Sequence, residues 1–166
     1  MDSMSMEIRK YPDPILRKKC QKVREITPEI KRLAKEMTEA MIANEPSGIG
    51  LAAPQVGQTV RVIVVSTEKG PAVFINPEIT EKSREKESLT EGCLSFPGLF
   101  LDIKRPKRVR VQALDKDGQT VKIEAEGLFA RVLQHEIDHL DGILFIDRLR
   151  FDQKLWALAK YRRKSN

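Results

Sequence analysis

Residues 134–142 (QHEIDHLDG) carry the side chains best suited to chemistry in this chain. His135 and His139 are four residues apart, so on a helix their side chains lie one turn apart on the same face. Two imidazoles placed in this way can bind one metal ion, and Glu136 stands beside the first of them as a candidate base. No other histidine occurs in the sequence. The HExxH pattern therefore predicts a metal site, although so short a pattern also occurs by chance on solvated helices.

The residues around this pattern predict that the helix carrying it is buried. Gly142 is a typical helix stop, so the helix should end near residue 140. Buried histidine and glutamate side chains need polar partners, and one metal ion would serve all three. A metal centre is therefore favoured over a solvated helix face. The apolar residues on which the burial prediction depends are Leu128, Phe129, Val132, Leu133, Ile137 and Leu140.

The histidine pair requires a third ligand, because catalytic metals commonly have three protein ligands and an open position. Phe145 stands where an extended HExxH peptidase pattern has a third histidine, and no glutamate follows Glu136. An aspartate or a cysteine remains. Cys93 lies in EGCLSFPG, beside a glycine and before a Pro-Gly turn, and we favour it as a ligand over a purely apolar role. Cys20, in a lysine-rich segment with prolines, is interpreted as a buried apolar residue.

Residues 48–57 (GIGLAAPQVG) have the spacing of a dinucleotide-binding fingerprint but not its context. That fingerprint follows a strand and begins a helix, whereas here a predicted helix precedes it and a predicted strand follows. Two interpretations stay open: a tight structural turn, or a loop that brings backbone groups and Gln55 to a ligand. Glycine permits close approach of another backbone, and the Gln55 amide is a donor suited to a developing oxyanion.

Composition and charge limit the class of protein. The chain has 166 residues, enough for one domain with a substantial core, and 40% hydrophobic with 33% charged residues is typical of globular proteins. No apolar run approaches the roughly 20 residues of a membrane span. Residues 1–19 lack an apolar signal core, so we expect a cytoplasmic protein. The net charge of +6 permits contact with nucleic acid without requiring it.

The pattern of elements predicts an α+β fold. Thr27 and Pro28 mark the start of a helix that should end near Asn44. Because helices and strands do not alternate regularly, we expect mixed or antiparallel sheets packed around the central helix that carries HExxH. The other expected elements are a helical turn within 11–20, strands at 59–65, 73–76, 109–114, 121–125 and 143–146, an exposed strand or loop at 78–89, and a helix at 151–161.

Three segments in order, GIGLAAPQVG, EGCLSFPG and QHEIDHLDG, resemble the signature segments of the peptide deformylase family. The resemblance extends over nearly the whole chain, including YPDPILRKKC near its start. It implies a metal-dependent hydrolase that removes the N-formyl group from the initiator methionine of nascent proteins and releases formate. The helical end is similar to that of bacterial members. The resemblance thus implies one deformylase domain over residues 1–166, ending in a basic helix over 148–166, in the bacterial cytoplasm.

Carried over position by position, the resemblance assigns Cys93, His135 and His139 as ligands of one divalent metal. Fe²⁺ is the native metal that it implies, and Zn²⁺, Ni²⁺ or Co²⁺ can replace it in preparations. Glu136 would act as general base and acid while a metal-bound hydroxide attacks the formyl carbonyl. Gln55 and the backbone N–H of Leu94 correspond to the oxyanion donors.

The residues expected to contact the substrate come partly from the resemblance and partly from the helical period, which places Leu128 and Val132 on the face of His135. A methionine pocket and plain core packing would explain the apolar members equally well. Residues 96–100 (FPGLF) depart from members with an arginine in this segment, so an arginine contact with the substrate is not implied. The expected contact residues are Gly48, Ile49, Gly50, Leu89, Leu128 and Val132.

Two other functions stay open at this point. One is a different small HExxH amidase or peptidase, against which the missing third histidine and later glutamate count. The other is a non-catalytic basic module that binds ribosomal RNA around a structural metal, which would need a fourth ligand.

The expected partners are formyl-methionine N-termini and, through the C-terminal helix, the ribosome; neither DNA nor a membrane is expected. Residues 148–166 hold seven Lys or Arg against one Asp. These basic residues would either contact RNA phosphates or only interact favourably with the negative end of their own helix dipole. The side expected to pack on the domain consists of Leu155, Trp156, Leu158 and Ala159.

Overall fold

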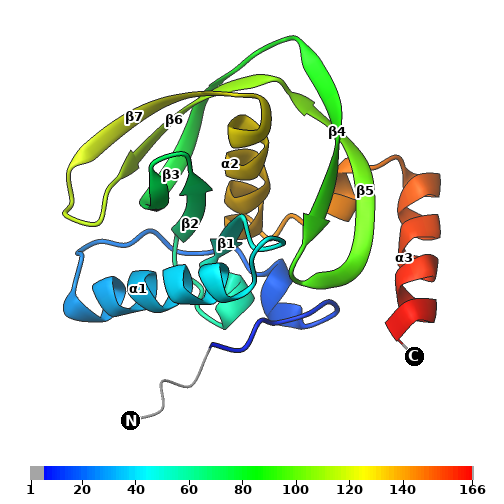
Figure 1. Ribbon diagram of the computed structural model, residues 1–166, viewed down its shortest axis with the longest axis horizontal. Helices are drawn as coiled ribbons and strands as arrows, with labels where there is room; N and C mark the ends of the chain where they lie inside the picture. Colours follow the sequence, from blue (N-terminus) through cyan, green and yellow to red (C-terminus); the bar gives the residue numbers. More distant parts are fainter. Residues whose placement is uncertain (1–5, 166) are drawn as a thin grey trace.

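The computed structural model describes residues 6–165 (Figure 1). Residues 1–5 and residue 166 lie outside the described residues. The former are part of the N-terminal segment that was expected to lack a signal core, and the latter ends the basic C-terminal segment. The elements in chain order are η1 (Pro14–Arg17), α1 (Pro28–Ala43), β1 (Gly50–Ala52), η2 (Ala53–Val56), β2 (Val62–Thr67), β3 (Gly70–Lys82), β4 (Lys86–Cys93), β5 (Phe96–Pro106), β6 (Arg108–Leu114), β7 (Thr120–Glu126), α2 (Gly127–Leu140), η3 (Phe145–Arg148) and α3 (Phe151–Ser165).

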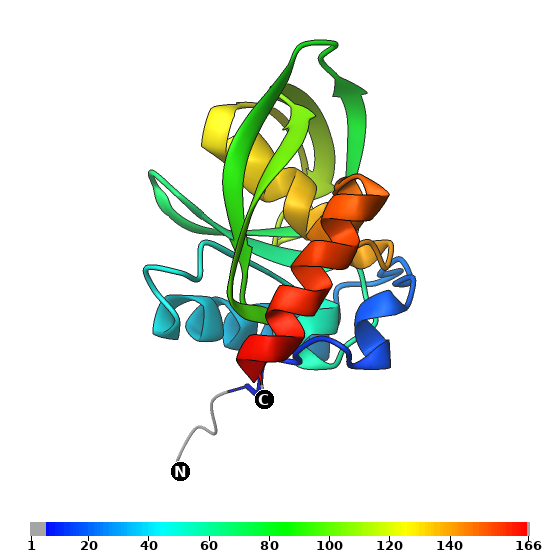
Figure 2. The same ribbon diagram turned by 90° about the vertical axis from the view of Figure 1, so that its right-hand side faces the viewer.

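The strands form two antiparallel sheets with α2 between them. Five strands are ordered β1-β2-β3-β6-β7, and within residues 6–165 β4 pairs only with β5. Figure 1 shows α2 at the centre, with the five-stranded sheet on one side, the β4–β5 hairpin on the other and α1 below. Figure 2 shows α3 lying along the outside of that hairpin. The prediction of an α+β fold with antiparallel sheets around the HExxH helix is confirmed.

Three apolar clusters form the core, and α2 and β5 belong to different ones. Leu133 and Ile137 of α2 pack with Ile63 and Val111 of the five-stranded sheet. A second cluster joins α1 to β1 and β2. The third joins β5, through residues such as Ile103, to η3 and α3. Apolar packing therefore holds α2 to the large sheet, and a separate apolar core holds the β4–β5 hairpin to the C-terminal elements.

Local signals set the ends of the helices where the sequence indicated. The Thr27 hydroxyl accepts from the Ile30 N–H at 3.3 Å, and Asn44 is the C-cap of α1. Gly142 follows α2 with φ of 72°, and a Cβ there would lie 2.5 Å from the Arg17 carbonyl oxygen. Only glycine fits that position, because the left-handed conformation and the close approach of η1 both exclude a side chain. The predicted α1 boundaries and the Gly142 stop are confirmed.

One expected strand is wrong and another has different bounds. Residues 143–146 are not a strand, because Phe145–Arg148 form the 3-10 helix η3, whose Asp147 side chain accepts from the Leu144 N–H at 2.9 Å. The expected strand 59–65 is displaced to β2, since residues 59–61 instead exchange backbone hydrogen bonds with Gln21. Strand β5 was not expected, because Pro97 and Gly98 indicated a turn where the strand begins. The hairpin expected around residues 115–118 is confirmed as β6 and β7.

Of the side of α3 expected to pack on the domain, only Leu158 does so among the described residues, while Leu155, Trp156 and Ala159 are exposed. Leu155 and Trp156 are 53% and 57% exposed, whereas Ala157 and Tyr161 are buried. Residues 157 and 161 are one turn apart, and they share an apolar cluster with β5. The helix continues to Ser165, beyond the expected residue 161. The expected basic helix over 148–166 is wrong at its start, because Arg148 belongs to η3 and α3 begins at Phe151. Within residues 6–165, no helix has both the length and the apolar character needed to cross a membrane.

Candidate metal centre

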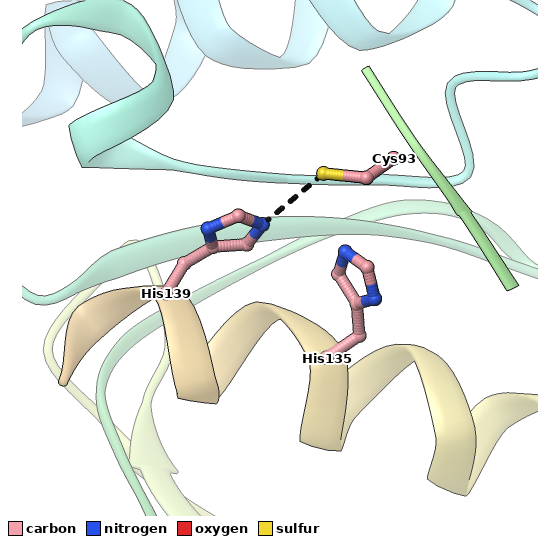
Figure 3. A group of neighbouring side chains, drawn as sticks. All are labelled: Cys93, His135 and His139. Carbon is pink, nitrogen blue, oxygen red and sulfur yellow. Dashed lines mark hydrogen bonds between the residues drawn. The ribbon is translucent and has the colours of Figure 1, made fainter. Parts of the chain in front are cut away.

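Cys93, His135 and His139 meet from two elements (Figure 3). Cys93 ends β4, and the two imidazoles leave α2 on the side that faces its sulfur. The ligand atoms all lie within 4.8 Å of one another, and Cys93 Sγ is 3.5 Å from His139 Nε2. Among residues 6–165 this is the one such group of histidine, cysteine and acidic ligands. One thiolate and two imidazoles suit a borderline divalent cation such as Zn²⁺ or Fe²⁺.

The side chain of Glu136 lies beside these three residues and makes no hydrogen bond within the described chain. Its Oε1 is 3.9 Å from Nε2 of both His135 and His139, and its Oε2 is buried without a hydrogen-bond partner. Burial raises the pKa of Glu136 to about 7. A buried carboxyl oxygen without a partner is costly unless a further group bonds to it. The residues present therefore fit a divalent cation with a solvent molecule that Glu136 can reach.

A buried carboxylate orients the first histidine. Glu91 Oε1 is 2.8 Å from His135 Nδ1, which leaves Nε2 of that ring for a metal. Arg105 donates to Glu91 at 2.6 and 3.0 Å, and Arg131 donates to its Oε2 at 2.7 Å. Burial alone would raise the pKa of Glu91, but the bonds to His135 and Arg105 outweigh it and lower the pKa to about 2. Glu91 is thus a fixed anion behind the ligand.

Without a bound metal, the pKa values of the two imidazoles are shifted in opposite directions. Burial, helped by the charge of His135, holds the pKa of His139 well below its usual range. Burial also opposes protonation of His135, but contacts with Cys93 and Glu91 outweigh it and raise the pKa of His135. His139 is therefore neutral, the form that binds metals, and His135 keeps the proton that a metal would displace.

The glycine loop reaches the same centre. A Cβ on Gly50 would lie 2.9 Å from both Glu136 Cγ and Val132 Cγ1, so only a glycine lets β1 approach α2 this closely. The buried Gln55 accepts from the Ala52 N–H at 2.9 Å through Oε1. Its Nε2 therefore points toward Cys93 Sγ, at 3.6 Å. These contacts favour the interpretation in which the loop brings backbone and an amide to a ligand.

A cavity of about 70 Å³ opens beside the ligands. Ile49, Leu128 and Val132 line it, together with Gly50 and Leu94. An open groove of about 1100 Å³ lies next to this cavity, between the N-terminal segment, the end of α1 and the start of β5. Cys93 and Ile49 line both the cavity and the groove.

Two of the expected contact residues are not among those that line the cavity. Leu89 is half-buried on β4, opposite Ile103. Gly48 is buried in a turn, where a Cβ would lie 2.5 Å from the Met41 carbonyl oxygen.

The sequence reasoning missed the charged residues behind the ligands. Glu91, Arg105 and Arg131 are each no more than 5% exposed. One feature of the sequence could have indicated them: a charged residue that stands alone among apolar ones. The clearest example is Arg131, in the apolar part of α2. Long charged side chains are rarely buried unless they are paired, so such a position predicts a buried ion pair.

The antiparallel α+β fold, the Cys-His-His cluster and the unpartnered glutamate define the class as metal-dependent hydrolases of the HExxH type. The family model described as polypeptide deformylase matches residues 5–154. The chain belongs to the peptide deformylase family, a family of metal-dependent enzymes.

Known relatives agree over most of the chain. A protein of Dictyoglomus thermophilum named peptide deformylase is 52% identical over 145 residues, covering 87% of this chain and 93% of that protein. The crystal structure of peptide deformylase from Ehrlichia chaffeensis has a TM-score of 0.90 and 39% identity, and the match covers 98% and 97% of the two chains. A structure from the same organism in complex with actinonin has a TM-score of 0.89, 42% identity and coverage of 97% and 98%.

Proposed function

We propose that this chain hydrolyses the formamide bond of N-terminal formyl-methionine on nascent polypeptides, releasing formate and a free amine. Membership of the peptide deformylase family supports the reaction. The observation that carries it is the buried Glu136 Oε2, which has no partner among residues 6–165 and lies beside the Cys-His-His cluster at the end of a cavity. A carboxyl group so placed is a proton carrier rather than a ligand.

Cys93, His135 and His139 would hold one divalent cation, Fe²⁺ in the native protein. A cation bound there would acidify a water molecule and polarise the formyl carbonyl. Glu136 takes the proton from the attacking water and later delivers it to the leaving amine nitrogen, so its protonation is restored at the end of the cycle.

Two donors meet the negative charge that grows on the formyl oxygen. The Gln55 amide is held by the Ala52 N–H through its oxygen and donates one N–H to Ser95 Oγ at 3.1 Å. The other N–H faces the site, on the side of Cys93 Sγ. The backbone N–H of Leu94, which follows Cys93, is the second donor. Donors fixed before the reaction stabilise a developing oxyanion without reorganisation.

The methionine side chain occupies the cavity lined by Ile49, Leu128 and Val132. Val132 is one turn before His135, so a larger side chain there would fill the space next to the ligands. Val132→Trp should raise the Michaelis constant for formyl-Met peptides while the metal content stays unchanged. Unchanged kinetics would place the methionine elsewhere.

Anaerobic purification, metal analysis and formate release from formyl-Met peptides test the activity. We expect one metal per chain and one formate for each amine formed, with no cleavage of the same peptide carrying an acetyl group. Cleavage of ordinary internal peptide bonds would instead support a different HExxH peptidase. A metal-containing chain that releases no formate would contradict the proposal.

We also propose that the end of α3 contacts the ribosome, and that the chain acts in the bacterial cytoplasm. Arg148 and Lys154 are bonded to Asp138 and Asp147, so they are not available for RNA. The basic residues after Tyr161 make no ion pair among residues 6–165; these are Arg162, Arg163 and Lys164.

A chain ending at Tyr161 separates RNA binding from simple capping of the helix. We expect weaker co-sedimentation with ribosomes at low salt and unchanged activity on short formyl peptides, because phosphate contacts depend steeply on salt. The charge control keeps its full length and carries Lys18→Gln, Lys19→Gln and Lys22→Gln, which remove the same three positive charges far along the sequence. Intact ribosome binding after truncation would mean that the basic residues do not contact the ribosome and only stabilise the end of their helix.

A further inference from the structure

The metal ligands come from two elements that belong to different parts of the core. Cys93 is on β4, whose only strand partner is β5, and β5 packs with η3 and α3. His135 and His139 are on α2, whose apolar side chains pack with the five-stranded sheet. The distance between the thiol and the imidazoles is therefore not set by either apolar cluster alone.

A buried ionic cluster lies between the two elements. Arg131, four residues before His135 on α2, is 4% exposed. Its guanidinium donates to Glu91 Oε2 at 2.7 Å, to the Ile103 carbonyl at 2.5 Å and to the Glu87 carbonyl at 2.6 Å. One side chain of the histidine helix thus bonds to both strands of the hairpin that carries Cys93.

The same cluster reaches the ligand ring itself. Glu91 is two residues before Cys93 on β4, and its Oε1 bonds to His135 Nδ1. Arg131 and Arg105 share the other oxygen, Oε2. The planar guanidinium is a rigid fork, so its bonds fix directions as well as distances. A shift of Arg131 would rotate the Glu91 carboxylate and with it the ring of His135.

We propose that Arg131 is a positioning residue of the metal centre, which sets the separation of the Cys93 strand from the histidine helix and the orientation of His135. It thereby determines how long the bound metal is retained. This inference rests on the proposed function only in taking Cys93, His135 and His139 as the metal ligands.

The experiment compares Arg131→Met and Arg131→Lys with a matched control, Arg61→Met. Arg61 is also largely buried and bonds to a backbone carbonyl and a carboxylate, those of Leu140 and Asp141, at 3.1 and 2.9 Å. It makes no contact with Glu91 among the bonds of the described chain. Three properties are measured: the rate of Zn²⁺ loss to excess chelator, the absorption spectrum of the Co²⁺-substituted protein, and urea unfolding of the metal-free protein.

We expect Arg131→Met to lose Zn²⁺ about 10- to 100-fold faster than the wild type, because groups that orient metal ligands have effects of this size. Its Co²⁺ spectrum should change, since thiolate and imidazole geometry determine those bands. Arg131→Lys keeps the charge toward Glu91 but lacks the fork, so an intermediate rate is expected. Arg61→Met should lose stability and keep the wild-type rate and spectrum.

Wild-type Zn²⁺ loss and an unchanged Co²⁺ spectrum in Arg131→Met would overturn the inference, whatever the stability of the variant. If Arg131→Met does not fold, Arg131→Lys decides: faster Zn²⁺ loss supports the inference, and wild-type retention overturns it. A wild-type chain that bound neither metal would overturn the proposed function itself, which separates the two failures.

Discussion

The two sides of α2 are held by different forces. Toward the five-stranded sheet, Leu133 and Ile137 are buried among apolar side chains. Toward the β4–β5 hairpin, Arg131, Asp138 and His135 face the charges of Glu91 and Arg105. Apolar contact is non-directional and tolerates small displacements, whereas hydrogen-bonded ions fix angles. The ligand-bearing side of the helix is the side held by directional bonds.

This difference separates stability from geometry. Burial of paired ions gives little net stability, because desolvation offsets most of their attraction. Apolar burial gives about 25 cal/mol per Å² and is the largest favourable contribution to folding. The ionic side of α2 is therefore expected to govern the metal centre, and the apolar side to govern the stability of the fold.

The largest effect should come from Cys93→Ala, which removes the one ligand that the hairpin contributes. We expect loss of the metal and of formate release, because two imidazoles alone seldom retain a catalytic metal. Cys20→Ala is the control, since Cys20 lies in the apolar cluster and burial raises the pKa of its thiol to about 11. Metal analysis after purification decides. Equal metal content in the two variants would rule out Cys93 as a ligand.

The next effect concerns chemistry without metal binding. Glu136→Gln keeps the shape of the side chain but cannot accept a proton, so turnover should fall by about 10²- to 10⁴-fold. The metal should stay bound, because Glu136 is not a ligand. Steady-state formate release and metal content measure the two properties on one sample. Near-normal turnover in the metal-loaded variant would contradict the role of Glu136.

A substitution on the opposite side of the helix should leave the centre intact. Leu133→Ala removes a fully buried side chain facing the large sheet, and the free energy of unfolding should fall by about 2–5 kcal/mol. The rate of Zn²⁺ loss from the folded protein should stay within about twofold of the wild type, since the ionic contacts are kept. Urea unfolding and chelator competition test this contrast. Rapid metal loss here would show that apolar packing also sets ligand geometry.

The smallest effect concerns the charges that hold the C-terminal elements. Burial alone would raise the pKa of Asp147, but bonds from Arg17, Lys154 and the Leu144 N–H outweigh it and lower the pKa below 3.8. A carboxyl with a lowered pKa adds stability above its unfolded pKa, and this is lost as the pH falls through its folded value.

The wild type should therefore exceed Asp147→Asn in stability at neutral pH, and the difference should shrink as the pH falls below the unfolded pKa of about 3.9 and through the lower folded value. The comparison uses metal-free protein, because a bound metal would add its own pH dependence to the stability through the protonation of its ligands. Urea unfolding of both proteins across this range gives the comparison, with Asp152→Asn as an exposed acidic control. A constant difference at all pH values would mean that the charge of Asp147 contributes nothing.

Features that depend on residues close together in the chain could be predicted before the structure. The ends of α1, the stop at Gly142 and the β6–β7 hairpin follow from caps and turns that involve residues only a few positions apart. The i, i+4 spacing also determined that His135 and His139 share one face of a helix. Their role as ligands with Cys93 was implied by the family resemblance and remains a prediction for the variants above.

The contacts that hold the candidate ligands depend on the complete fold. Glu91 is 44 residues from His135 and 40 from Arg131, so no local pattern reports these bonds. The packing side of α3 was predicted only in part. Leu158 packs as expected, but Ala157 and Tyr161 are buried in the cluster with β5, a strand that the sequence had not indicated. Neighbouring residues determine backbone conformation through short-range sterics and caps. Which charges meet across 40 residues depends on how the sheets close around α2, and that is a property of the whole fold.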